Sequence, residues 1–202
     1  MNSQSAAYVF GNSAREQQRL VDQAEGLEPE TCWLLDHIGI EKGWRAADIG
    51  CGPIGVLNLL SERVGSRGSV IGIEREHRFA DMARTEIDKR GLKNASIVQG
   101  DVLSAGQDSG SLDLVHERLV LINVPEVNQR ALVEQMVGLL KPGGTIVLQE
   151  YDRVSYVCYP EHPLDDSAGR VHGGFSQKWR ERRHESLPPL ALELSRHSRR
   201  PD

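Results

Sequence analysis

A glycine-rich segment, Asp48-Ile-Gly-Cys-Gly-Pro-Ile-Gly55, holds the residues whose types and spacing best suit ligand binding. Gly50 and Gly52 permit a tight turn and let a ligand approach the backbone closely, because glycine has no side chain. A helix that starts after this turn has free backbone amides to offer the ligand. The segment also matches the G-x-G-x-x-G pattern of dinucleotide-binding proteins. It predicts a cofactor-binding turn, with a ligand-free structural turn as the alternative.

Two acidic residues follow later β-like runs, at positions suited to recognising a nucleoside. Glu74 ends a run about 20 residues after the glycines, where a carboxylate accepts hydrogen bonds from both ribose hydroxyls. Asp101 follows a third run, where its carboxylate can accept from the exocyclic amine of adenine and the amide of Val102 can reach a ring nitrogen. The alternatives are a solvated strand end at Glu74 and a simple Gly-Asp turn at Asp101.

The elements that must position these residues alternate along the chain. Five short β-like runs are separated by helical patterns, and we expect strands at 45–50, 69–74, 95–99, 112–117 and 145–150. In one intervening helix Phe79, Met82, Ala83 and Ile87 recur at helical spacing, and Gly91 is suited to end it. Such alternation predicts a mostly parallel sheet with helices on both faces, and ligands that bind at the carboxyl ends of its strands.

The flanks of this core carry helix start and stop signals. Ser13 and Glu16 form a capping box, which predicts a helix running to about residue 24. Pro29 suits the first turn of a second helix, running to about residue 37. Pro142, Gly143 and Gly144 are expected to end the last helix and reverse the chain into the fifth strand.

Composition excludes several classes of protein. The chain has 202 residues, enough for one domain, and a net charge of −5, which disfavours binding to nucleic acid. It has no apolar run of the length that spans a membrane and no secretory signal at Met1, so we expect a cytoplasmic protein. Three cysteines without a C-x-x-C pair predict neither a disulfide framework nor a metal site.

The composition changes near residue 160. Four of the seven histidines lie beyond it, at His162, His172, His184 and His197, in a segment with no clear helical or strand period. We therefore expect three parts: an N-terminal helical lid over 1–40, a cofactor-binding core over 41–159, and an atypical, disordered tail over 160–202.

Taken together, the glycine-rich turn, the two acidic positions and the Lys-Pro-Gly-Gly stretch resemble the class I S-adenosylmethionine-dependent methyltransferases, over roughly residues 8–159. The fold expected from the resemblance is a Rossmann-like α/β sheet. It also implies a methyl transfer to a small-molecule acceptor, with S-adenosylmethionine as cofactor. The cofactor-binding residues it implies are Asp48, Gly50, Cys51, Gly52, Glu74, Arg75, Asp101, Val102 and Arg118.

The resemblance also places the methyl-transfer site beside the fourth strand. His116 is the first candidate for a general base, because its ordinary pKa lies near neutrality, and Glu117 is the second. A packed strand residue is the alternative for His116. Arg118 is expected to contact the cofactor carboxylate or a substrate acid, with a surface ion pair as the alternative. Tyr151, Asp152 and His162 are candidates for the acceptor pocket.

Two features depart from the family pattern. The third loop glycine is expected at position 54, which is Ile54 here, with Gly55 one step later, so we expect a narrower loop. The antiparallel hairpin that normally follows the fifth strand has no counterpart, which predicts an exposed sheet edge and homodimers formed through it.

Alternative functions remain at this point. A nicotinamide-dependent oxidoreductase shares the glycines and Glu74, and a non-catalytic, truncated cofactor-binding relic accounts for the altered C-terminus. A nucleic-acid methyltransferase is disfavoured, because the charge is acidic and no Asp/Asn-Pro-Pro-aromatic run is present.

Overall fold

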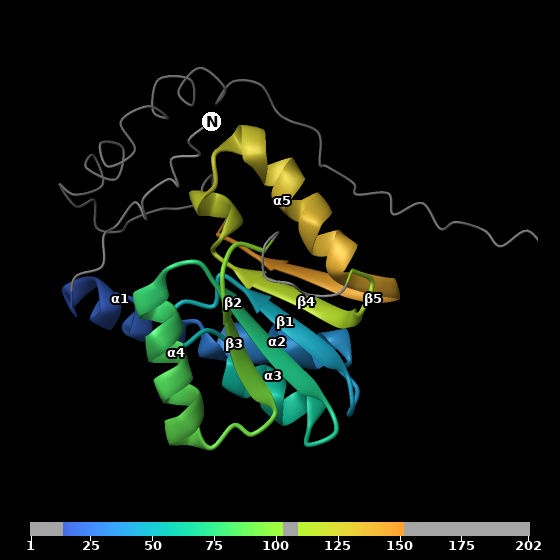
Figure 1. Cartoon of the computed structure of the whole chain (residues 1–202), viewed down its shortest axis with the longest axis horizontal. Helices are drawn as coiled ribbons and strands as arrows, with labels where there is room; N and C mark the ends of the chain where they lie inside the picture. Colours follow the sequence, from blue (N-terminus) through green and yellow to red (C-terminus); the bar gives the residue numbers. More distant parts are fainter. Residues whose placement is uncertain (1–13, 103–108, 152–202) are drawn as a thin grey trace, which may run out of the picture. The chain divides into compact units, whose positions relative to one another are not determined.

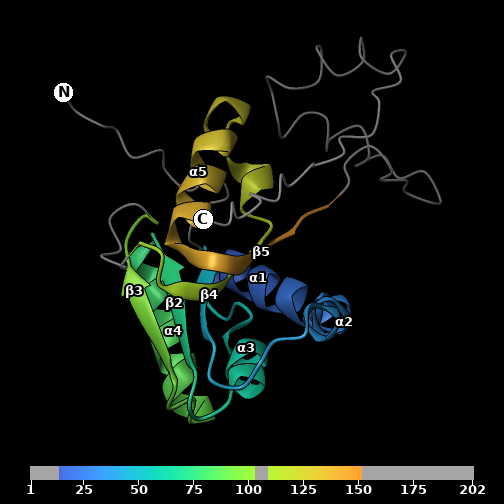
Figure 2. The same cartoon turned by 90° about the vertical axis from the view of Figure 1, so that its right-hand side faces the viewer.

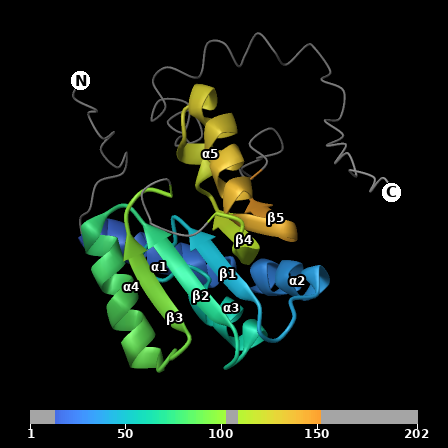
Figure 3. The same ribbon diagram turned by 45° about the vertical axis from the view of Figure 1, so that its right-hand side comes forward.

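Five strands form one parallel sheet in the order β3-β2-β1-β4-β5, with β3 and β5 at its two edges (Figure 3). The computed structural model describes residues 14–102 and 109–151. The chain divides into two units, Met1–Tyr151 and Asp152–Asp202, and all the described residues belong to the first. The strands are β1 (Arg45–Ile49), β2 (Ser69–Glu74), β3 (Ala95–Gln99), β4 (Leu112–Arg118) and β5 (Leu140–Gln149).

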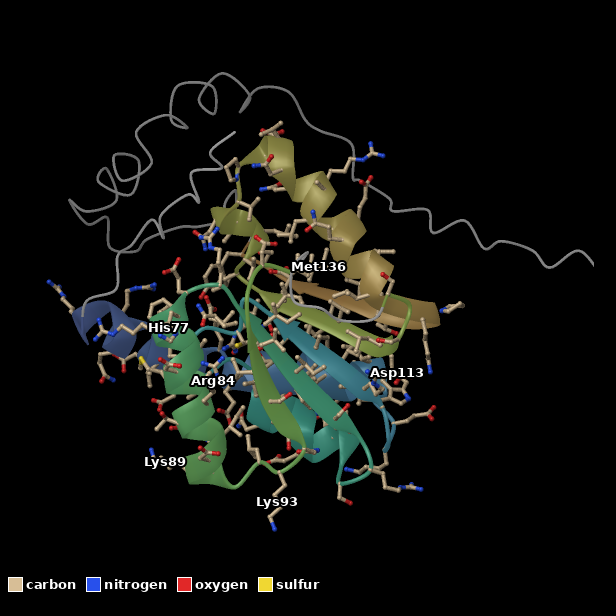
Figure 4. The ribbon with its side chains drawn as sticks, viewed as in Figure 1. His77, Arg84, Lys89, Lys93, Asp113 and Met136 are labelled. Carbon is tan, nitrogen blue, oxygen red and sulfur yellow. The ribbon has the colours of Figure 1, made fainter. Side chains whose placement is uncertain are left out.

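Helices cover both faces of this sheet (Figures 1 and 2). They are α1 (Ala14–Gly26), α2 (Glu28–Ile38), α3 (Leu57–Val64), α4 (His77–Arg90) and α5 (Glu126–Leu139), with a 3-10 turn, η1 (Leu121–Asn123). Side chains from α2, α3 and α4 share one apolar core with β1, β2 and β4. A second core lies on the opposite face, where Met136 points from α5 toward the sheet (Figure 4). The predicted Rossmann-like α/β fold is confirmed.

The order of the strands fixes where a ligand can bind. The sheet grows from β1 toward β2 and β3 in one direction, and toward β4 and β5 in the other. In parallel α/β sheets, ligands occupy the crevice at the carboxyl ends of the strands where the order reverses, here between β1 and β4. The glycine-rich segment follows β1 and the residues after Arg118 follow β4, so both reach this crevice.

Glycines end two helices, and the sequence predicted one of them, Gly91. Gly39 and Gly91 take the left-handed conformation after α2 and α4, with φ of 73° and 65°. This conformation is strained for other residues, and it lets the next amide return to the last turn of the helix. Pro29 lies in the first turn of α2, as predicted. Ser13 and the capping box it was predicted to form lie outside the described residues.

The fifth strand begins earlier than predicted. It starts at Leu140 rather than at residue 145, and Leu140 pairs with Leu112 before an irregularity in the register with β4. Gly143, with φ of 83°, allows this deviation. Pro142 and the two glycines after it therefore lie inside β5, and α5 ends before them at Leu139.

Several predictions concern residues beyond Tyr151. The disordered tail over 160–202, the missing hairpin, and the acceptor-pocket candidates Asp152 and His162 all lie outside the described residues. Homodimer formation through the edge of β5 likewise stays a prediction. Within the described ranges, no helix is long and apolar enough to cross a membrane.

Candidate functional site

The glycine-rich segment forms a turn that is tied to the neighbouring strand. The amide of Gly50 donates to the carbonyl of Ile73 on β2 over 2.7 Å, which brings the turn to the carboxyl end of β2. Gly50, Gly52 and Gly55 all have positive φ, at 62°, 59° and 53°. This left-handed backbone explains why glycine occupies all three positions.

Gly55, rather than position 54, provides the third glycine that this turn needs. A Cβ atom at Gly55 would lie 2.5 Å from Oδ2 of Asp48. No side chain fits there without moving the buried carboxylate. Ile54 lies instead in the wall of a small pocket, together with Gly55 and Arg118.

Asp48, at the end of β1, is buried and fully engaged. Its Oδ2 accepts the amide of Val56 over 3.0 Å, and its Oδ1 lies 2.9 Å from Nδ1 of His116. The expectation of free amides at the start of α3 is therefore wrong for Val56, because Asp48 already satisfies that amide. Asp48 stabilises the turn from the protein interior, and because its side chain is only 2 % exposed a ligand has little access to it.

Glu74, at the end of β2, joins the second strand to the turn. Its Oε2 accepts the amide of Gly52 over 2.8 Å, and its Oε1 accepts the amide of Glu76 over 2.8 Å. Burial raises the pKa of Glu74, while these two amides act in the opposite direction. Each carboxylate oxygen has two acceptor positions, so Glu74 keeps capacity for two further donors.

The third strand places Asp101 at the same carboxyl end of the sheet as Glu74. The amide of Gly100 donates to the carbonyl of Glu74 over 2.9 Å, so the residues after β3 lie beside the end of β2. Asp101 is exposed, whereas the side chain of Val102 is buried in the second core. Arg75 is exposed and pairs with Glu76 at 3.7 Å.

Cys51 lies inside the turn and faces the protein interior. Its thiol is buried, and a Cβ at Gly72 would lie 2.8 Å from its Sγ. Burial raises the pKa of Cys51 well above its ordinary value, and the nearby charges of Asp48 and Glu74 add to the rise. The side chain is therefore a neutral packing group, and the contribution of Cys51 to a ligand site is its backbone.

These residues fit the nucleoside part of S-adenosylmethionine. A Cβ at Gly52 would meet no heavy atom within 4 Å, so open space lies directly beside this backbone. Glu74 supplies acceptors at the rim of that space, and Asp101 follows one strand further along the same edge. A turn without side chains, flanked by two carboxylates, suits a ribose and an adenine.

The two catalytic candidates are buried on opposite faces of β4. His116 is 0 % exposed and pairs with Asp48 on the face that carries α3. In the tautomer with its proton on Nδ1, the ring donates this bond to the carboxylate of Asp48. Nε2 of the same ring is buried without a hydrogen-bond partner among the described residues. A general base must reach the acceptor, and this ring has no exposed surface.

Glu117 meets a second carboxylate that the sequence did not single out. Glu117 Oε2 accepts the amide of Val120 over 2.9 Å, and Glu150 Oε1 accepts the amide of Ile122 over 3.1 Å. Burial of Glu117 and the neighbouring Glu150 carboxylate raise the pKa of Glu117 to about 8, against the opposing effect of the Val120 amide. The Glu117–Glu150 pair therefore favours a form in which one of the two carboxyl groups is protonated.

Arg118 points toward the N-terminal helices rather than into solvent. Its guanidinium donates to Oγ1 of Thr31 over 3.1 Å and to the carbonyl of Gly55 over 3.5 Å. The hydroxyl of Thr31 also bonds Gln149 on β5 over 3.0 Å. Burial lowers the pKa of Arg118, while Asp48 and other nearby acidic groups oppose the shift. The surface ion pair considered for Arg118 is wrong, because this network docks α2 onto the sheet.

A small pocket of about 70 Å³ opens beside Arg118. Residues from α1, α2, the turn, α3 and α4 line it: Ala24, Glu25, Glu28, Ile54, Gly55, Asn58, Leu59, Arg90 and Arg118. Residues of both N-terminal helices thus border the glycine-rich turn, and the helical lid over 1–40 stays a prediction. Among the described residues, no cluster of three or more metal-ligating side chains occurs.

The sequence patterns missed three residues of this region. Glu150 and Gln149 lie at the carboxyl end of β5, and Val120 follows β4. A Cβ at Gly50 would lie 2.6 Å from Cγ2 of Val120, so this side chain closes over the turn. The signal available for Glu150 was its position one residue beyond a strand, much as Asp101 lies two residues beyond β3.

Comparison with known proteins shows the family of this chain. A family model described as a methyltransferase domain matches residues 40–183. A demethylmenaquinone methyltransferase of Staphylococcus epidermidis is 30 % identical over 145 residues, which are 70 % of this chain and 58 % of that protein. The demethylmenaquinone methyltransferase of Shouchella clausii is 31 % identical over 127 residues, 61 % of this chain and 53 % of the relative. The chain thus spans little more than half the length of these curated relatives.

Solved structures share the fold. A SAM-dependent methyltransferase from Aquifex aeolicus superposes with a TM-score of 0.62 at 20 % identity, covering 80 % of this chain and 86 % of the other. A methyltransferase structure from Methanococcus maripaludis gives a TM-score of 0.59 at 18 % identity, covering 90 % and 78 %. Together with the family match, these findings show that the chain belongs to the methyltransferase domain family, which implies S-adenosylmethionine as its cofactor.

Proposed function

We propose that this protein transfers a methyl group from S-adenosylmethionine to a small-molecule acceptor. One observation supports the proposal most directly: backbone and carboxylate hydrogen bonds connect the carboxyl ends of β1, β2 and β3, so the residues that follow these strands lie side by side. Glu74 is central, because its carboxylate accepts the amide of Gly52 and its carbonyl accepts the amide of Gly100. The family match supports methyl transfer over hydride transfer on the same type of sheet.

We assign the cofactor-binding roles by strand. Gly50 and Gly52 leave the turn open for the methionine portion, and Glu74 accepts the ribose hydroxyls. Asp101 and the amide of Val102 are placed to meet the adenine. Arg118 already donates to Thr31 and Gly55, so we give it the role of holding the N-terminal helices against the turn.

When bound, S-adenosylmethionine supplies a methyl group that its sulfonium has already activated. The chain must hold the acceptor in line with that methyl and exclude water, a positioning effect that supplies about 7–11 kcal/mol in favourable cases. A general base is needed only for an acidic acceptor group such as a hydroxyl. Neither His116 nor Glu117 has an exposed surface in the described structure. We therefore propose that both position backbone segments of the site, rather than contact the acceptor.

The curated relatives suggest an acceptor, but this chain covers only part of their length. Those relatives are named for demethylmenaquinone, and this chain spans 58 % of the one from Staphylococcus epidermidis. A demethylated quinone is accordingly the first acceptor to test, followed by other small phenols and amines.

Calorimetric titration of the full chain with S-adenosylmethionine, S-adenosylhomocysteine and NADH tests the cofactor assignment. We expect micromolar dissociation constants for the first two ligands and no heat of binding for NADH. Binding of NADH alone would favour the oxidoreductase. Transfer of a labelled methyl group to the acceptor panel then separates an enzyme from a cofactor-binding relic, because a relic binds without transferring.

A further inference from the structure

The loop that follows β4 is held in an unusual conformation next to the cofactor site. Leu119 has a φ of 60°, a left-handed backbone conformation that is strained for a residue with a Cβ. Its amide donates to the carbonyl of Gln149 over 3.0 Å. Val120 follows and packs on Gly50 so closely that a Cβ at Gly50 would lie 2.6 Å from it. The surroundings must hold this loop in place against its strain.

Two carboxyl groups provide that hold. Glu117 accepts the amides of Val120 and Leu121, over 2.9 and 3.4 Å, and Glu150 accepts the amide of Ile122 over 3.1 Å. Three consecutive amides of the loop thus end on two side chains from adjacent strands. Among the described residues, two further side chains bond this loop: Gln129 of α5 donates to the carbonyls of Leu121 and Val124, and Asn123 donates to the carbonyl of Leu119.

The two carboxyl groups lie on the same face of the sheet. Side chains alternate along a strand, so Glu117 shares the face of Val115, which belongs to the second core. Glu150 continues the alternation of Ile146 on β5, which packs against the same core. Glu117 is 0 % exposed. Two carboxylates that meet in an apolar setting repel each other unless one of them is protonated, and a proton between them forms a hydrogen bond.

We propose that Glu117 and Glu150 share one proton and act as a positioning pair, which holds residues 119–122 so that Val120 closes over the glycine-rich turn. The effect on cofactor binding rests on the proposed function, whereas the effect on the loop does not. Loss of the shared proton leaves two buried charges side by side, which loosens the loop and opens the turn at Gly50.

The described groups packed around Glu117 are uncharged apart from Glu150, so the proton on this pair controls the charge at the loop. The sheet contributes apolar side chains from β1 and β2, and α5 contributes Met136 to the same core. The loop contributes backbone amides, and the nearby Gln129 is neutral. Among the described residues, Glu150 supplies the charge that acts on Glu117. The pKa of about 8 for Glu117 places the change between pH 7 and pH 9.

Hydrogen exchange of the amides of residues 120–122 tests the pair in the cofactor-free chain. In the wild type we expect their protection to fall about tenfold from pH 7 to pH 9, after correction for intrinsic exchange, because one group titrates near pH 8. Glu117→Gln supplies an amide that donates in place of the shared proton, so its protection should stay constant, whereas Glu150→Gln keeps the buried Glu117 and should retain a smaller fall. Glu117→Ala removes the acceptor and should lose protection at every pH.

Glu126→Gln is the matched control, because it makes the same change at an exposed residue of α5 and should follow the wild type. Parallel pH profiles for the wild type and Glu117→Gln would overturn the proposal. Titration with S-adenosylhomocysteine at pH 7 and pH 9 gives the functional arm, where the wild type should lose affinity relative to Glu117→Gln. If the wild type binds no S-adenosylhomocysteine at any pH and the exchange difference persists, the positioning pair stands and the proposed function fails.

Discussion

The turn after β1 and the loop after β4 are both held by buried carboxyl groups, but these groups have different partners. Each contains left-handed backbone and has amides that end on buried carboxyl groups, but only the loop after β4 has a non-glycine residue, Leu119, in that conformation. In the first, Asp48 has His116 as its partner and Glu74 receives two amides. In the second, Glu117 has another carboxyl group as its partner. Asp48 and Glu74 thus face hydrogen-bond donors, whereas burial and the neighbouring Glu150 carboxylate raise the pKa of Glu117.

The two regions therefore differ in their expected response to pH near neutrality. At the turn after β1, the partners of the two carboxylates are hydrogen-bond donors, and this is where we propose that the nucleoside binds. The loop after β4 depends on a proton that the solvent can remove, because the pKa of Glu117 lies near 8. Val120 connects the two by packing on Gly50.

Removing the partner of Asp48 should have the largest effect. His116→Ala leaves a buried carboxylate without its donor and creates a cavity, so we expect the free energy of unfolding to fall by about 3–5 kcal/mol. His116→Asn keeps a hydrogen-bond donor, so its free energy of unfolding should fall by less. Urea denaturation measures both variants, and His77→Ala, an exposed histidine of α4, is the control with little expected change (Figure 4).

The same variants separate positioning from base catalysis at His116. If His116 positions Asp48, the folded His116→Asn variant should keep most of its turnover once an acceptor is known. A folded His116→Asn variant without turnover would show instead that the ring acts as the general base.

Titration of the carboxyl pair should have a smaller effect on stability. The folded-state pKa of Glu117, about 8, lies above its ordinary value of 4.5, so the folded state binds the extra proton between these values. Stability from this group is therefore complete below pH 4.5 and is lost as pH rises through about 8. From pH 6 to pH 8 we expect it to contribute a loss of about 2 kcal/mol in the free energy of unfolding.

Urea denaturation of Glu117→Gln over the same pH range isolates this contribution. The variant should lack the slope that the wild type shows, whereas Glu126→Gln should retain it. A wild-type slope that Glu117→Gln leaves unchanged would assign the proton to another group and remove the contrast between the two regions.

The sequence identified the parts of the site that lie within single segments. The glycine-rich turn, Glu74 and Asp101 each follow a strand within a short motif, so their place at the sheet edge could be predicted from strand order alone. The left-handed glycines were also readable, although the structure assigns the third position to Gly55.

Pairs formed between strands could not be predicted in this way. Asp48 meets His116 because β1 and β4 are neighbours in a register that aligns these two residues. Glu117 meets Glu150 only because β5 adds next to β4. Both pairs need the sheet order and the register, which local patterns do not encode. The early start of β5 has the same origin, since pairing with β4 recruits Leu140 before the glycines.

The account depends most on Glu74, and one titration tests it directly. S-adenosylhomocysteine is titrated into the wild type, Glu74→Ala and the control Glu62→Ala, an exposed acidic residue of α3. Two hydrogen bonds to a charged group contribute about 3–5 kcal/mol, so Glu74→Ala should weaken binding at least about 100-fold, with Glu62→Ala unchanged. Equal affinity in all three proteins would contradict the cofactor site at the ends of β1, β2 and β3.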